Sequence, residues 1–208
     1  MARQKKIPIL KIPAGMPPRC AIGYLAFSLL PVLKKTARLN VSAQEIQEAA
    51  QKIRAVSRTD ARRLAHRIHG RAVHLYAVSG ATEPVALRWR AQLAENAKTL
   101  ASHHALPEMF HNEIEGWNFP RSLVRQSAAI FFTDRGEPAW LKKKRRFAEQ
   151  LVRRFGAIVL EVSSRGRTRL GRIFSLIALG DWVSYELALQ NGVDPVAVPS
   201  LEAVKKIK

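Results

Sequence analysis

Hydrophobic positions in the second half of the chain alternate between short continuous runs and longer stretches with helical spacing. The runs at 72–78, 100–106, 128–133 and 157–162 predict buried strands. Stretches 84–97, 137–155 and 170–189 repeat apolar side chains every three or four positions, which predicts helices. Because strands alternating with helices favour a parallel sheet covered on both faces, we predict an α/β fold, a three-layer α/β/α sandwich.

The part of the chain before this alternation has a different pattern. Residues 1–12 indicate a flexible or strand-like segment, and prolines favour a turn before Arg19. The apolar run 21–33 predicts a buried helix that ends at Pro31 and the basic residues after it. Further helices are expected at 43–56, 60–69 and 201–208, the first opened by a capping box of Ser42 and Glu45.

The charge balance bears on possible partners. Lysine and arginine number 35 against 16 aspartates and glutamates, a net charge of +19. Such an excess favours nucleic acid, acidic lipid or phosphorylated metabolites. The basic run Lys142–Arg146, continued by Arg153 and Arg154, is more typical of a solvated helix face. We therefore do not expect nucleic acid as a partner, and keep polyanion binding as an alternative.

The sequence also indicates the cellular compartment in which the protein is expected. No apolar run reaches the ~18 residues of a membrane-spanning helix, and no signal-peptide pattern follows the basic N-terminus. A single cysteine, Cys20, cannot form an internal disulfide, which agrees with a reducing compartment. We expect a cytoplasmic protein with no membrane association.

The most informative residues lie between 87 and 117. This segment contains a carboxylate, Glu95, and an imidazole, His111. Sugar isomerisation needs one group that removes a proton beside a carbonyl and another that moves protons on a ring oxygen. The spacing by itself also fits a solvated helix-end carboxylate and a partly buried histidine.

The amino-acid sequence around these residues is more specific. The strings ALRWRAQLAENAK, LPEMFHNEIEGW and GDWVSYELALQNGVDP resemble the bifunctional phosphoglucose/phosphomannose isomerases, which are built from two sugar isomerase (SIS) domains. The resemblance implies a flavodoxin-like C-terminal SIS domain at 40–208. The string GMPPRCAIGY is similar to the tail of the first SIS domain, so residues 1–39 are expected to be a remnant of that domain.

The resemblance implies roles for individual residues. Glu95 matches the family's catalytic base, and His111 matches a histidine that assists ring opening from the other subunit of a dimer. Arg19 matches an arginine that stabilises enediolate charge, and Lys205 could match an active-site lysine, although Lys206 and Lys208 are close by. The implied reaction converts glucose or mannose 6-phosphate to fructose 6-phosphate through a cis-enediol, with no metal or other cofactor.

Substrate binding is where the chain departs from the family. The family's phosphate-binding serines and threonines lie in the first SIS domain, and Ala94 replaces its usual asparagine. We expect weak activity from this chain alone, and as partners a phosphosugar together with a second copy or a separate N-terminal SIS chain. Ser79 and Gly80, before a helix N-terminus, could hold an anion. The alternative is a phosphosugar-binding SIS module without catalysis, for which a base is unnecessary.

Other noticeable residues have structural explanations. Trp89 and Trp182 are expected to be core anchors, and Asp181 to be paired within an apolar helix. His103 and His104 with His111 could suggest a metal cluster, but adjacent residues of a strand point to opposite faces. We predict no metal site.

Overall fold

The computed structural model describes residues 9–37 and 39–207. The chain separates into two compact units, Met1–Ile46 and Gln47–Lys208. Most of the segment 1–12, and Lys208 at the end of the last expected helix, lie outside the described residues. The interpretation of residues 1–39 as a domain remnant is not decided by this division and stays a prediction.

The first unit contains η1 (Pro18–Cys20), α1 (Ile22–Thr36) and the start of α2 (Ala43–Arg54). The expected buried helix is wrong in two respects: α1 has no buried residue, and Pro31 lies inside it. Apolar side chains such as Leu29 are 52% exposed. Apolarity shows that a helix can be buried, but burial also requires a covering element. The capping box is confirmed, since Glu45 N–H donates to Ser42 Oγ at 3.2 Å.

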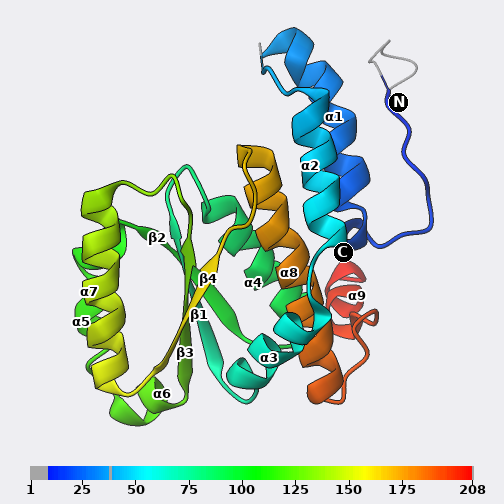
Figure 1. The fold of residues 1–208 in the computed structure, drawn as a ribbon. Helices are drawn as coiled ribbons and strands as arrows, with labels where there is room; N and C mark the ends of the chain where they lie inside the picture. Colours follow the sequence, from blue (N-terminus) through cyan, green and yellow to red (C-terminus); the bar gives the residue numbers. More distant parts are fainter. Residues whose placement is uncertain (1–8, 38, 208) are drawn as a thin grey trace. The chain divides into compact units, whose positions relative to one another are not determined.

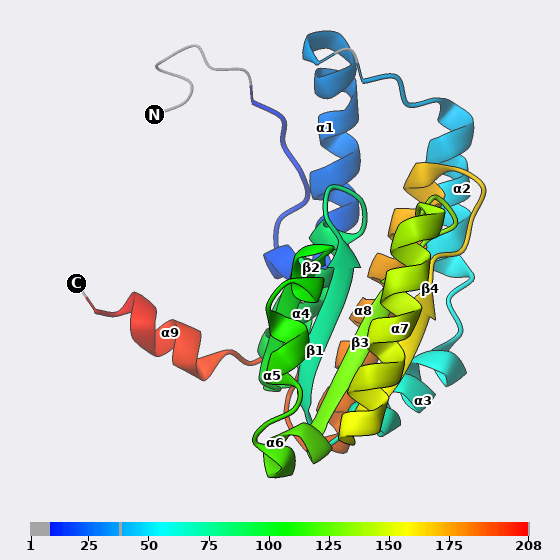
Figure 2. The ribbon, with the colours of Figure 1, turned by 90° about the vertical axis from the view of Figure 1, so that its left-hand side faces the viewer.

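The second unit is built on a four-stranded sheet with the order β2-β1-β3-β4. Its strands are β1 (Ala72–Val78), β2 (Ala101–Leu106), β3 (Ser127–Thr133) and β4 (Ile158–Ser163), close to the four predicted runs. All three pairings are parallel. The carboxyl ends of the strands therefore lie at one edge of the sheet, as Figures 1 and 2 show.

Helices cover both faces of this sheet, which confirms the three-layer prediction (Figure 1). One face carries α3 (Arg58–Ile68), α4 (Glu83–Glu95) and α8 (Arg169–Gln190). The other carries η2 (Glu108–Phe110), α5 (Glu113–Gly116), α6 (Arg121–Arg125) and α7 (Ala139–Phe155), and α9 (Pro199–Lys205) closes the chain. Among the described residues, no helix is long and apolar enough to cross a membrane.

Alternation along β1 divides the core into two clusters. Leu75 and Ala77 pack against α3, α4 and α8, whereas Tyr76 points to the α7 side. Every residue of β3 is buried, as expected for a central strand of a parallel sheet. Connections at the carboxyl edge run to α4 on one face after β1, and to α7 on the other face after β3. The crevice between these strand ends is where open α/β sheets bind ligands.

Candidate active site

Glu95 is the last residue of α4 and is half-buried. Because α4 runs back from the carboxyl end of β1, its C-terminus lies near the amino edge of the sheet. The next strand begins there, and Val73 N–H donates to Leu100 O at 3.3 Å. Glu95 is therefore at the edge opposite the strand carboxyl ends.

The helix that carries Glu95 is clasped to α8 by charged and polar groups. Arg88 donates to Asp181 through two nitrogens at 2.8 and 3.1 Å, and Gln92 donates to the same carboxylate at 2.7 Å. The expected pairing of Asp181 is confirmed. One turn further on, Asn96 Nδ2 donates to Ser184 Oγ at 2.9 Å. These contacts hold the last two turns of α4 in one position on α8.

The residues after Glu95 close the end of the helix. Lys98, in the left-handed region at φ 53°, donates from Nζ to Glu95 O at 2.9 Å and to Asp194 O at 2.6 Å. Asn191 Nδ2 donates to Ala97 O at 2.8 Å. A cation on the terminal carbonyls complements the helix dipole. Two of the resembling strings thus meet in space, and their shared contacts position the backbone of Glu95.

His111 lies elsewhere on the domain. It is exposed and follows η2, directly after the carboxyl end of β2. β2 has six residues and spans ~20 Å. Since Glu95 precedes this strand and His111 follows it, one chain does not bring the two side chains together.

A polar cluster beneath the segment 107–117 ties it to the sheet, and we call Tyr76, Ser102, His104, Glu113 and Trp117 the Glu113 cluster. Tyr76 OH donates to Glu113 Oε1 at 2.5 Å, and His104 Nδ1 lies 2.9 Å from Glu113 Oε2. Trp117 Nε1 donates to Tyr76 OH at 2.8 Å, and Ser102 Oγ lies 2.8 Å from His104 Nε2. Sequence reasoning missed this cluster, although the parallel register pairs Tyr76 with His104.

The cluster shifts the pKa values of two of its members and of the neighbouring His74. Burial acts to raise the pKa of Glu113, but hydrogen bonds from His104 and Tyr76 outweigh it and hold that pKa below its ordinary value. Burial, reinforced by the charge of Glu113, raises the pKa of Tyr76. Burial and the neighbouring His104 lower the pKa of His74. Glu113 is thus a carboxylate at neutral pH, and in that form it ties the segment 107–117 to Tyr76 and His104 of the sheet.

We expect the segment 107–117 to loosen in acid. A carboxylate with a lowered folded-state pKa contributes stability that is complete above its unfolded pKa, about 4.3, and is lost as the pH falls through the folded value. Hydrogen-exchange protection of a peptide covering 107–117 should therefore fall below about pH 4. In Glu113→Gln, protection should already be low at neutral pH, while Glu115→Gln, changing an exposed neighbour, should behave like the wild type. Equal protection in both variants would contradict this role.

Ser79 and Gly80 lie where expected, at the carboxyl end of β1 before α4. Ser79 Oγ donates to Glu83 Oε2 at 3.0 Å, and the amides of Ser79 and Ala81 donate to backbone carbonyls. Gly80 has φ +68°, and its carbonyl accepts from Arg169. These groups thus already have partners within the chain. Their role in anion binding stays a prediction.

The amides before α8 also have an internal partner. Glu48 accepts from the backbone N–H groups of Arg167 at 2.5 Å and Thr168 at 2.9 Å. The first of these hydrogen bonds, helped by the Thr168 side chain, lowers the pKa of Glu48 to about 2. A carboxylate of the chain therefore occupies the place that an anion would take at this helix N-terminus.

The remaining predicted residues are dispersed. Arg19 is half-buried in the first unit, and Lys205 is exposed at the end of α9. His104 joins the Glu113 cluster, whereas burial and the charge of Arg90 of α4 lower the pKa of its neighbour His103. The adjacent histidines thus point to opposite faces, as expected. Within 9–37 and 39–207, no group of three His, Cys, Asp or Glu side chains could hold a metal ion.

Comparison with solved structures agrees with the architecture. A glucose-6-phosphate isomerase like protein from Thermus thermophilus superposes with a TM-score of 0.63 and 23% identity, over 92% of this chain and 64% of that one. Tagatose-6-phosphate ketose/aldose isomerase from Escherichia coli superposes with a TM-score of 0.57 and 16% identity, over 80% of this chain and 50% of that one. The second unit of this chain is therefore an α/β domain with the SIS fold.

Sequence comparison identifies the family. Residues 57–207 match the bacterial phospho-glucose isomerase C-terminal SIS domain. Proteins named bifunctional phosphoglucose/phosphomannose isomerase are 28% identical over 99% of the chain in Aquifex aeolicus, and 30% identical over 95% in Thermoplasma acidophilum. The chain belongs to this family, which confirms the resemblance. It spans 62% and 61% of the length of these two relatives.

Proposed function

We propose that this chain carries the second-domain part of an aldose–ketose isomerase site for glucose or mannose 6-phosphate. Glu95 takes the proton from C2 of the open-chain aldose and returns it to C1 after a cis-enediol forms. His111 assists ring opening, and Arg19 stabilises the enediolate charge. Lys205, near the C-terminus, is the proposed further active-site residue.

The observation that carries this proposal is the clasp between α4 and α8. A general base must be held in one position relative to the carbon acid. Side chains of α8 and its C-cap bond to successive positions around Glu95, and these side chains are Asp181, Ser184 and Asn191. Lys98 donates to the carbonyl of Glu95. Such positioning is more than a solvated helix-end carboxylate needs.

The separation of Glu95 and His111 supports a site shared between chains. β2, ~20 Å long, lies between them, whereas both groups must reach adjacent atoms of one sugar. We therefore propose that a second chain supplies His111, in a homodimer or in an assembly with a separate SIS chain. From the resemblance we also expect the 208 residues alone to turn over substrate weakly, with kcat and KM both affected.

The role of Glu95 is tested by following deuterium exchange. Incubating fructose 6-phosphate with the protein in D₂O should label C1 as the enediol forms and is reprotonated, and NMR detects this even when turnover is slow. Glu95→Gln should reduce labelling by about 10²-fold or more while ligand affinity changes little. Glu115→Gln, which removes an exposed carboxylate, is the matched control. Unchanged labelling in Glu95→Gln would remove Glu95 from the mechanism.

Mixing two inactive variants tests the shared site. If His111 comes from a second copy, equal amounts of Glu95→Gln and His111→Ala chains, dissociated and reassembled, should recover about a quarter of wild-type activity. Half of the dimers are then mixed, and each mixed dimer has one complete site. No recovery, in a mixture shown to exchange subunits, would exclude a site shared between copies.

The alternative is a phosphosugar-binding module without catalysis. The crevice between the ends of β1 and β3 is lined by Thr82, Asp134, Ser164, Arg169 and Arg172, and has a volume of 30 Å³. Arg172 and Ser164 are already bonded to Asp134, at 2.8 and 2.5 Å. This space suits about one water molecule and is too small for a sugar phosphate. An isomerase must bind the same ligand, so the crevice does not separate the two functions. The positioned Glu95 favours the isomerase proposal, because a binding module needs no general base.

A further inference from the structure

The outward side of α7 combines cations with uncovered aromatic rings. Trp140 and Phe147 are 54% and 60% exposed. They are seven residues apart, so they lie on the same side of the helix, separated by about 10 Å along its axis. The exposed charged residues of the helix are Lys142, Lys143, Lys144, Arg146, Arg153 and Arg154. We call Trp140, Phe147 and these cations the α7 face.

The acidic residues of the segment 137–155 are withdrawn from its surface. The side chains of Glu137, just before the helix, and Glu149, within it, are 2% and 4% exposed and are paired with Arg145. In α7, all of whose residues the structure describes, every exposed charged side chain is consequently basic. The sequence pattern favoured an ordinary solvated face, but such faces usually carry charges of both signs.

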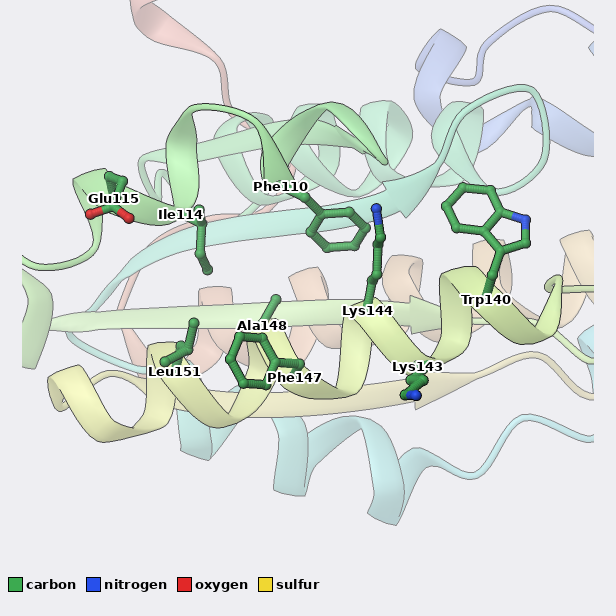
Figure 3. A pocket seen from close by; sticks show the side chains of 9 residues that line it. All are labelled: Phe110, Ile114, Glu115, Trp140, Lys143, Lys144, Phe147, Ala148 and Leu151. Carbon is green, nitrogen blue, oxygen red and sulfur yellow. The ribbon is translucent and has the colours of Figure 1, made fainter.

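A groove beside these rings extends the apolar surface. Its volume is about 700 Å³, and Phe110 and Ile114 form the wall opposite α7. Figure 3 shows Phe110 and Lys144 pointing toward each other across it, with Trp140 at one end. The Lys144 ammonium lies 5.8 Å from the centre of the Trp140 ring. Glu115 is the carboxylate of the lining.

The positive charge and the exposed aromatic rings together indicate which kind of partner fits the α7 face. A second copy placing its α7 face here would oppose cation to cation, which is unfavourable. A strand of nucleic acid offers phosphates to the cations and flat bases to the rings, and this combination binds single strands without sequence preference. In a duplex the base faces are already stacked on each other, so only the phosphates would be used.

We propose that the α7 face and its groove bind single-stranded nucleic acid, with bases stacked on Trp140 and Phe147 and phosphates on the surrounding lysines and arginines. This inference does not depend on the isomerase proposal. It uses a helix on the face of the sheet opposite α4, the helix that carries Glu95.

Fluorescence anisotropy with a labelled oligothymidylate tests the proposal on the full chain over a range of salt concentrations. Trp140→Ala and Phe147→Ala should each weaken binding roughly 5- to 100-fold and leave the salt dependence unchanged, because stacking releases no counterions. Lys143→Gln with Lys144→Gln should reduce the slope of log K against log salt by about 1.4, at about 0.7 per phosphate contact.

Matched controls come from the opposite face of the sheet. Arg67→Gln with Arg90→Gln removes two exposed cations from α3 and α4, and Tyr185→Ala removes a partly exposed ring from α8. These variants should bind the oligonucleotide like the wild type. Equal effects from control and α7 variants, a duplex that binds as tightly as the single strand, or no binding at low salt would each overturn the proposal.

Discussion

Gly180→Ala is expected to destabilise the second unit by about 3 kcal/mol or more, although alanine is the better helix former by about 1 kcal/mol. A Cβ at this position of α8 would lie 2.1 Å from Trp89 Nε1 and 2.4 Å from its Cε2. The indole cannot retreat easily, because Trp89 is 1% exposed and lies edge-on against Phe132, with ring centres 5.0 Å apart. Moving it would also break its 2.9 Å hydrogen bond to Leu176 O.

Urea unfolding followed by circular dichroism measures this effect. Gly23→Ala is the control, since a Cβ at this glycine of α1 meets no atom within 4 Å. It should leave stability unchanged or slightly higher. Adding Trp89→Leu to Gly180→Ala should cost less than the sum of the two single changes, because the smaller side chain removes the collision. A Gly180→Ala protein as stable as the wild type would show that the close approach is not rigid.

Arg145→Met is expected to destabilise the protein by about 3–5 kcal/mol at neutral pH, because it leaves buried carboxylates without their cation. Arg145 is 2% exposed in its side chain and donates to Glu137 at 2.9 and 3.1 Å. It also pairs with Glu149, and lies 3.3 Å from Glu161, which is 48% exposed. Burial, opposed by Arg145, already raises the pKa of Glu149.

The pH dependence distinguishes this cause from a simple loss of packing. In the variant, burial without the cation raises the folded-state pKa of the carboxyls above the unfolded value, so protonation favours the folded form. The deficit in unfolding free energy should therefore shrink as the pH falls through the raised folded-state pKa values, and this change should be complete below the unfolded value of about 4.3. Arg146→Met, at the exposed neighbour, should change stability by less than about 0.5 kcal/mol. A deficit independent of pH would contradict the ionic explanation.

Arg145 illustrates what the pattern could not distinguish. The basic run 142–146 was interpreted as a solvated face, and this holds for Lys142, Lys143, Lys144 and Arg146 but is wrong for Arg145. Nothing in the run separates this residue from its neighbours. Its burial depends on Glu161 of β4 and Glu137, which reach it only when the helix packs on the sheet.

The candidate site shows the same division. The resembling strings predict roles for Glu95 and His111, and the pairing of Asp181 was expected from its place in an apolar helix. The partners were not predictable, because Arg88 and Asp181 are 93 positions apart and meet only through the packing of α4 on α8. The Glu113 cluster likewise forms only when the segment 107–117, which follows β2, packs on the face of the sheet that carries Tyr76 and His104.

Local pattern determined the strands, the helices after them, the capping box and the family, because each depends on residues close together in the chain. Tertiary packing decided the exposure of α1, the burial of Arg145 and the pairing of Arg88 on α4 with Asp181 on α8. Exposure and pairing depend on what covers a side chain, and that is settled only when distant segments meet.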